Sequence, residues 1–167
     1  MERKIDLVVV GGCGHVGLPL AIAFANTGLS VAAFDINATV VDQVNGGHMP
    51  FLEPEGPEQL AKAIDAKNIL ATTDPTVINN AEYIVVVVGT PVDEHLNPDP
   101  MVVPNVIEDI SSHMRPGQLL ILRSTVYPGV TRLVENLMTR LETGVEVSFC
   151  PERIAEGTAF TELYSLP

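Results

Sequence analysis

The stretch Gly12-Cys13-Gly14-His15-Val16-Gly17 decides the fold of this 167-residue chain. It follows an apolar run from Ile5 to Val10 and opens a helical stretch from about His15 to Asn26. A run that is apolar at nearly every residue is typical of a strand buried on both faces of a parallel sheet. Glycines spaced G-x-G-x-x-G between such a strand and a helix allow a tight turn, close approach of the backbone to a pyrophosphate, and close helix–strand packing. The stretch therefore predicts a dinucleotide-binding turn whose contacts come from Gly12, Gly14, His15, Val16 and Gly17.

Outward from this turn, short β-branched runs alternate with helical stretches. The expected strands are 5–10, 31–34, 69–72, 83–88, 119–122 and 145–149, and the expected helices are 15–26, 39–44, 57–66, 103–114 and 130–141. Asp74-Pro75 resembles a helix start, with Asp at the N-cap and Pro at the first helical position. This alternation is the signature of a parallel sheet with crossover helices. Six strands in two βαβαβ halves predict an α/β fold of the Rossmann type: one domain over residues 1–167 with a doubly wound, six-stranded parallel sheet.

Asp35 stands at the end of the second expected strand, 18 positions after Gly17 (35 − 17). A carboxylate at this place can accept hydrogen bonds from the ribose hydroxyls of a dinucleotide. The alternative is a purely structural glycine turn beside a surface aspartate. No Lys or Arg occurs between Ile5 and Ala61, so this segment offers no cation to a 2′-phosphate. We therefore expect the cofactor to be NAD rather than NADP.

The composition argues against several classes of partner. The formal net charge is −12 and no basic cluster occurs, which disfavours nucleic acid, because affinity for phosphate backbones rests on Lys and Arg. The longest apolar runs, such as Tyr83 to Val88, are too short to cross a bilayer, and we identify no signal peptide. The only two cysteines, Cys13 and Cys150, form no disulfide framework and fit a cytoplasmic location. The histidines lack metal-ligand spacing, so we expect no metal; they are His15, His48, His95 and His113.

Polar residues follow the last three expected strands. Thr90 and Thr125 come just after the fourth and fifth, at the end of the sheet where an open α/β fold has its ligand crevice. Thr125 can donate to a cofactor, a substrate oxygen or a water, or it can cap the next turn. Glu152 and Glu156 lie four apart after the sixth strand, and on a helix they would share a face. Such a pair can act as a base and a charge stabiliser, and the alternative is a solvated acidic turn.

Three further stretches resemble the UDP-glucose/GDP-mannose dehydrogenase family. They are Gly14-His15-Val16-Gly17-Leu18-Pro19 with Glu53-Pro54, Val88-Gly89-Thr90-Pro91-Val92-Asp93 with Pro98-Asp99, and Ser124-Thr125-Val126-Tyr127-Pro128-Gly129 with Cys150-Pro151-Glu152-Arg153-Ile154-Ala155-Glu156-Gly157 and Glu162-Leu163. The resemblance covers the whole chain. The stretch that begins at Cys150 is most similar to the branch acting on UDP-N-acetylhexosamines, which includes UDP-N-acetylmannosamine dehydrogenase.

The resemblance implies an NAD-dependent oxidoreductase of polysaccharide biosynthesis. Such an enzyme oxidises the C6 hydroxyl of a nucleotide sugar to a carboxylate with two NAD, through a thiohemiacetal and a thioester on a cysteine. By the same resemblance, Glu152 is an acid/base, Thr125 helps hold the reactive water, and Arg153 and Ile154 contact the nucleotide sugar. The family's nucleophilic cysteine lies in a later glycine-rich stretch that this sequence lacks. Cys150 is therefore expected to be a buried small apolar residue and not the nucleophile.

The resemblance also implies that the chain is the first domain of a longer protein. The long dimer-forming helix and the sugar-binding domain, with its catalytic lysine, asparagine, aspartate and cysteine, are expected to be absent. We expect the longer protein to be a homodimer, and the chain alone to be a monomer that binds NAD without turnover.

The chain departs from the family at two positions, with His15 where Tyr is usual and Val40 where Arg or Lys is common. Two alternatives stay open. One is a β-hydroxyacid dehydrogenase of the 6-phosphogluconate type, which shares the fold but lacks the stretches around Thr125 and Glu152. The other is a non-catalytic nucleotide-sensing module, which would need only the segment from Gly12 to Asp35.

Overall fold

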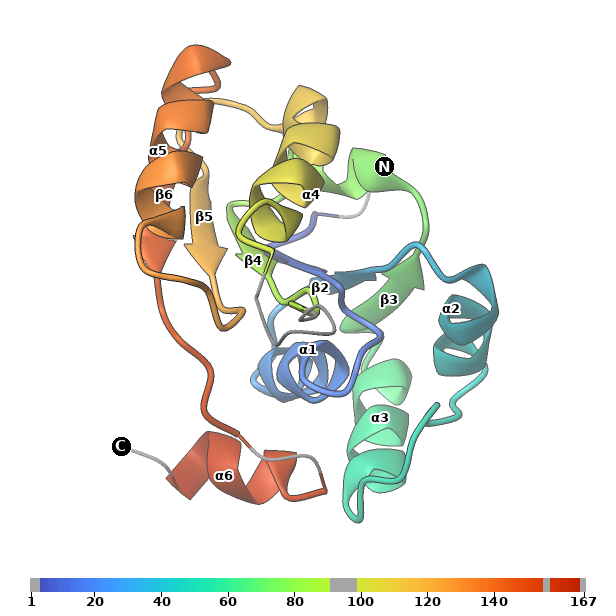
Figure 1. Cartoon of the computed structure of the whole chain (residues 1–167). Coiled ribbons are helices and arrows are strands. Elements are labelled where there is room, and N and C mark those ends of the chain that lie inside the picture. The colour runs from blue at the N-terminus through green and yellow to red at the C-terminus, as the bar shows by residue number, and fades with distance from the viewer. Residues whose placement is uncertain (1–3, 91–98, 155–156, 166–167) are drawn as a thin grey trace.

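Six parallel strands form the centre of the molecule in a computed structural model that describes residues 4–90, 99–154 and 157–165 (Figure 1). The strands are β1 (Leu7–Val10), β2 (Val31–Phe34), β3 (Ile69–Thr72), β4 (Tyr83–Val86), β5 (Leu119–Leu122) and β6 (Glu146–Phe149). Their order in the sheet is β3-β2-β1-β4-β5-β6. The order reverses between β1 and β4, as it does in doubly wound dinucleotide-binding folds. The predicted fold class is confirmed.

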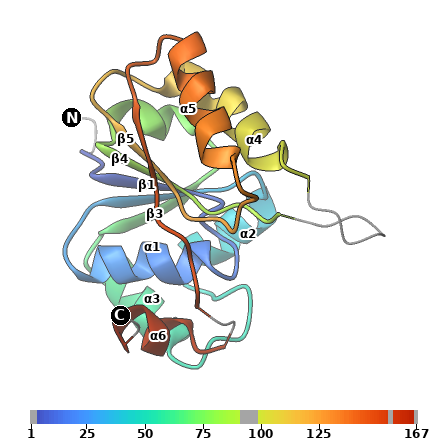
Figure 2. The ribbon, with the colours of Figure 1, turned by 60° about the vertical axis from the view of Figure 1, so that its left-hand side comes forward.

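Helices cover both faces of this sheet (Figures 1 and 2). They are α1 (Gly17–Asn26), α2 (Ala38–Asn45), α3 (Gly56–Asp65), α4 (Val102–Ile110), α5 (Val130–Arg140) and α6 (Ala159–Ser165), with 3₁₀ turns η1 (Pro75–Asn80) and η2 (Ser111–His113). Helices α1, α2, α3 and α6 contribute side chains to one hydrophobic core, and η1, α4 and α5 contribute to the other. In the part of the chain that the structure describes, no helix is long and apolar enough to cross a membrane.

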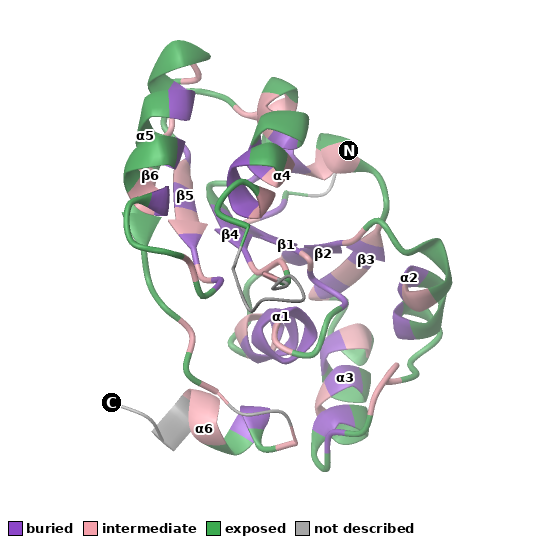
Figure 3. Ribbon diagram, viewed as in Figure 1, coloured by how far each residue is buried: buried purple, intermediate pink, exposed green. Residues whose placement is uncertain are grey.

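Strand β1 separates the two cores. Val8 and Val10 pack into the core beneath α4 and α5, whereas Leu7 and Val9 pack into the core beneath α1. Side chains alternate between the faces of a strand, so a strand covered on both sides must be apolar at every position. All four residues of β1 are buried, as Figure 3 shows by colour. The glycine turn therefore begins from a rigid, fully buried strand.

The structure differs from the expected helices in three places. The predicted helix 103–114 is α4 followed by the 3₁₀ turn η2. Helix α6 was not predicted; its Phe160 is only 2% exposed and packs with the residues of α1 and α3. Asp74 caps as expected, but the helix that it caps is the 3₁₀ turn η1, where its Oδ1 accepts a hydrogen bond from the backbone N–H of Thr76 at 2.9 Å.

Candidate functional site

A cleft of about 410 Å³ opens at the carboxyl ends of β1, β4 and β5. Its lining comes from the glycine turn and from the segments that follow β4, β5 and β6. The lining residues are Gly14, His15, Val16, Gly17, Val87, Val88, Gly89, Thr90, Arg123, Ser124, Thr125, Glu152 and Ile154. This is the end of an open parallel sheet at which ligands bind, beside the point where the strand order reverses.

The glycines of the turn serve different purposes. A Cβ at Gly17 would lie against the backbone carbonyl oxygen of Gly11, well inside contact distance, so only glycine lets α1 start this close to the turn. A Cβ at Gly14 would meet one neighbour only, the same carbonyl oxygen of Gly11 at 3.5 Å, which is ordinary contact. Gly14 is exposed and lines the cleft. The absence of its side chain therefore leaves room for a ligand rather than for another part of the protein.

The carboxylate of Asp35 fastens the turn to the end of β2. Its Oδ2 accepts a hydrogen bond from the backbone N–H of Cys13, and its Oδ1 accepts one from the N–H of Asn37, both at 3.1 Å. The Cys13 side chain is buried, and this burial, together with the nearby Asp35 charge, raises the pKa of the thiol to about 12. Cys13 is thus a packed residue without thiolate character at neutral pH.

The imidazole of His15 stacks on the ring of Phe51, with a centroid distance of 4.3 Å and an interplanar angle of 26°. Phe51 lies in the loop between α2 and α3, so this contact ties that loop to the glycine turn. The exposed His15 also lines the cleft. The residue that departs from the family's usual tyrosine is therefore an aromatic packing partner in this chain.

Ser124 joins the ends of β4 and β5. Its buried Oγ accepts a hydrogen bond from the backbone N–H of Val88 and donates one to the carbonyl of Val88, both at 2.9 Å. These bonds hold the segment leading to Thr90 beside the segment that carries Thr125. Both threonines line the cleft and also a neighbouring hollow of about 250 Å³ toward α4 and α5.

The carboxylate of Glu152 is held from two sides. Its Oε1 accepts hydrogen bonds from the backbone N–H groups of Arg153 at 2.6 Å and Ile154 at 2.9 Å. Its Oε2 forms an ion pair with Nη2 of Arg123 at 2.5 Å. Only 9% of the Glu152 side chain and 19% of the Arg123 side chain are exposed. A carboxylate that is buried to this extent and still borders the cleft has a fixed position at the ligand site.

Residues 6–167 match the model of the UDP-glucose/GDP-mannose dehydrogenase family, NAD binding domain. The chain belongs to this family. The match spans the glycine turn, Asp35 and the segments around Thr125 and Glu152.

The most similar proteins include nucleotide-sugar dehydrogenases. The UDP-N-acetyl-D-mannosamine dehydrogenase of Pyrococcus horikoshii is 33% identical over 162 residues, which cover 93% of this chain and 38% of that relative. Among solved structures, a UDP-glucose dehydrogenase from Pyrobaculum islandicum superposes with a TM-score of 0.86 at 26% identity, over 98% of this chain and 39% of the other. The GDP-mannose dehydrogenase of Pseudomonas aeruginosa gives 0.83 at 25% identity, over 95% and 38%. The chain thus spans about two fifths of the length of its relatives.

Most of the expected site residues of this family member line the cleft together. They are Gly14, His15, Val16, Gly17, Thr90, Thr125, Glu152 and Ile154. Gly12 is buried beneath the turn, where a Cβ would lie 2.6 Å from the Cα of Ala33. Arg153 lines an adjacent hollow instead of the cleft. Asp35 contacts the turn through the backbone N–H of Cys13 and is not among the residues that line the cleft. Glu156 lies outside the described residues.

One expectation about the segment after β6 was wrong, and the helix that would place Glu152 and Glu156 on one face is not formed at residues 151–154. Glu152 stands on a segment without regular secondary structure, and the two N–H groups that follow it bind its carboxylate. Cys150 is exposed and not buried, because β6 is an edge strand whose residues are mostly exposed. Its Sγ accepts a hydrogen bond from Nη1 of Arg123 at 3.1 Å.

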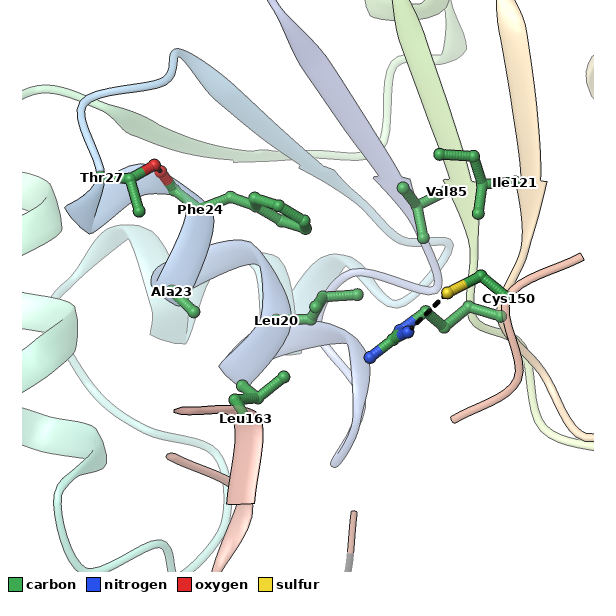
Figure 4. A pocket seen from close by; sticks show the side chains of 9 residues that line it. Leu20, Ala23, Phe24, Thr27, Val85, Ile121, Cys150 and Leu163 are labelled. Carbon is green, nitrogen blue, oxygen red and sulfur yellow. Dashed lines mark hydrogen bonds between the residues drawn. The ribbon is translucent and has the colours of Figure 1, made fainter. Parts of the chain in front are cut away.

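Sequence reasoning missed Arg123, Ser124 and Phe51. Arg123 carried the clearest signal, since it is a basic residue placed directly between a buried apolar strand and the Ser124-Thr125 pair. It also borders a second, apolar cavity of about 290 Å³ between α1, the sheet and Leu163 of α6. Figure 4 shows this cavity, with the hydrogen bond to Cys150 drawn at its rim.

Proposed function

We propose that this chain is the NAD-binding domain of a longer cytoplasmic enzyme, a nucleotide-sugar 6-dehydrogenase. The enzyme oxidises the C6 hydroxyl of a UDP-N-acetylhexosamine or UDP-hexose to a carboxylate, with two NAD per turnover. A central helix and a sugar-binding domain follow residues 1–167 in this proposal, and the longer protein is a homodimer. Support comes from the family and from the Pyrococcus relative, which is named as acting on UDP-N-acetyl-D-mannosamine.

The residues of the turn fit NAD. The backbone at Gly14 is open to the cleft, and a Cβ there would occupy the space into which a pyrophosphate has to come. The start of α1 offers backbone N–H groups and the positive end of a helix dipole to an anion. Asp35 stands at the end of β2, where its remaining lone pairs can accept from ribose hydroxyls. Bound NAD supplies the hydride acceptor of the reaction.

The chemistry assigned to this chain falls to Thr125 and Glu152. Their placement in one cleft with the glycine turn is the observation that carries the proposal. The Thr125 hydroxyl holds the water that attacks a thioester formed on a cysteine of the following domain, and Glu152 takes the proton that this water loses. Ile154 in the cleft and Arg153 beside it bind the nucleotide sugar. Glu156 remains a second acid/base candidate by sequence.

A fusion protein tests the proposal. Residues 1–167 replace the matching part of the Pyrococcus enzyme, and NADH formation is measured with UDP-N-acetylmannosamine and with UDP-glucose. The fusion should produce NADH, and the 167-residue chain alone should produce none while still binding NADH. Glu152→Gln in the fusion should lower kcat by about 10²–10⁴-fold and leave NADH affinity within about threefold. Near-normal kcat in this variant would remove Glu152 from the mechanism. Turnover by the chain alone, or NADH binding without turnover by a folded fusion, would contradict the proposed division of labour and favour a sensing module.

A further inference from the structure

The Arg123 guanidinium makes two contacts at the base of the cleft. Nη2 forms the ion pair with Oε2 of Glu152, and Nη1 donates to Sγ of Cys150. The backbone strengthens the same pairing, because the Glu152 N–H donates to the Arg123 carbonyl at 3.2 Å. The flat guanidinium can contact two partners at once because its N–H groups form a rigid fork. Cys150 and Glu152, two residues apart, therefore both contact one side chain that directly follows the neighbouring strand β5.

This arrangement leaves Glu152 little freedom. Its Oε1 is occupied by the N–H groups of Arg153 and Ile154, and its Oε2 faces Arg123. If the guanidinium were removed, a mostly buried carboxylate would lose its counter-charge, and rotation toward water would relieve the cost. The N–H contacts to Oε1 would then be lost as well. Arg123 thus determines which way the carboxylate points relative to the cleft.

We propose that Arg123 is a positioning residue for Glu152, a role that rests on the proposed function of Glu152. Arg123 acts on the reaction through the carboxylate, and its effect on turnover depends on Glu152 being present. The Cys150 contact keeps the guanidinium in the orientation that the ion pair needs.

The geometry can be tested on the 167-residue chain by amide hydrogen exchange. In Arg123→Gln, the N–H of Ile154 should exchange at least about tenfold faster than in the wild type, because its acceptor has moved away. Arg132→Gln is the matched control, since this arginine is 78% exposed and forms an ion pair across one helical turn with Glu135, away from Glu152 in the sequence. The control should leave the exchange of Ile154 unchanged. Unaltered exchange of Ile154 in a folded Arg123→Gln chain would overturn the proposal.

The role in turnover is tested in the fusion protein with a double-mutant cycle. Arg123→Gln should lower kcat at least about tenfold, with KM and NADH affinity within about threefold, and Arg123→Lys should recover part of the loss. In the Glu152→Gln background, Arg123→Gln should lower kcat no further. The double variant has no unpaired buried carboxylate at position 152, so we expect it to fold. Additive losses would show that Arg123 does not act through Glu152. If Glu152→Gln alone left kcat unchanged, the proposed function of Glu152 would fail, and the positioning role would fall with it.

Discussion

Adding one methyl group to the glycine turn should separate cofactor binding from folding. At Gly14, an alanine Cβ would have ordinary contact with the Gly11 carbonyl at 3.5 Å, and the backbone is not in the left-handed region. Gly14→Ala should therefore leave the free energy of unfolding unchanged or raise it by about 0.4–1 kcal/mol, because alanine reduces the entropy of the unfolded chain. Gly17→Ala is the contrast, since its Cβ would overlap the Gly11 carbonyl, which is backbone and cannot move aside cheaply.

The two variants should differ in both stability and affinity. Overpacking at Gly17 should cost about 2–3 kcal/mol of folding free energy, near the upper end for core insertions. For a domain of this size, that corresponds to a fall in Tm of roughly 4–12 °C. The Gly14 methyl should push a bound pyrophosphate away from the backbone and break at least one N–H···phosphate bond. Such bonds to charged groups contribute about 1.5–3 kcal/mol, so the NADH affinity should fall roughly 10- to 150-fold.

Calorimetric titration with NADH and thermal unfolding followed by circular dichroism measure both quantities on the 167-residue chain. The reasoning requires that Gly14→Ala melts no lower than the wild type and binds NADH much more weakly. Wild-type affinity in Gly14→Ala would place the pyrophosphate elsewhere. A melting temperature as low as that of Gly17→Ala would mean that Gly14 is needed for packing and not for ligand approach.

Three further predictions concern single side chains. At pH 8, a thiol reagent should modify the exposed Cys150 quickly and spare Cys13, because a pKa of about 12 leaves roughly one in 10⁴ of the Cys13 side chains as thiolate. Rapid loss of two thiols from the folded protein would contradict this. The backbone N–H of Ser30 donates a hydrogen bond to the Asp6 carboxylate at 2.9 Å and thereby lowers the pKa of this carboxyl group. The ionised carboxylate therefore stabilises the fold at pH values above the pKa of Asp6 in the unfolded chain, and this stabilisation is lost as the pH falls through the pKa of Asp6 in the folded chain. Asp6→Asn should therefore lower the urea midpoint more at neutral pH than in acid below the unfolded pKa, and an equal loss at both would refute it. NADH should bind at least about tenfold tighter than NADPH, and Asp35→Ala should narrow the gap; equal binding by the wild type would remove Asp35 as the discriminating residue.

The sequence predicted the sheet well because buried parallel strands have few alternatives. Strands β2, β3 and β5 begin and end at the predicted residues. Apolar runs bounded by polar or glycine residues leave little choice of where a buried strand can start and stop. The carboxyl-end placement of Thr90, Thr125 and Glu152 followed from the same sheet. The contacts of Arg123 with Cys150 and Glu152 could not be predicted, because they depend on where an edge strand places those two residues in space. The four-residue spacing of Glu152 and Glu156 left a helix open as a possibility, whereas in the structure the Glu152 carboxylate binds the next two backbone N–H groups in a segment without helix.

The described residues on each side of positions 155–156 are bound by residues far away in sequence. Before these positions, the carbonyl of Arg123 accepts from the Glu152 N–H. After them, the carboxylate of Glu53, which is only 6% exposed, accepts from the N–H groups of Gly157 at 3.1 Å and Ala159 at 3.0 Å, more than 100 residues along the chain. Glu53 belongs to the same loop as Phe51, whose ring stacks on the glycine turn at His15. One loop therefore contacts the turn that should receive the pyrophosphate and also the start of α6. Because Glu152 is bound to Arg123 through both its N–H and its carboxylate, its position beside the end of β5 is set by contacts within this domain, without a ligand or a second domain.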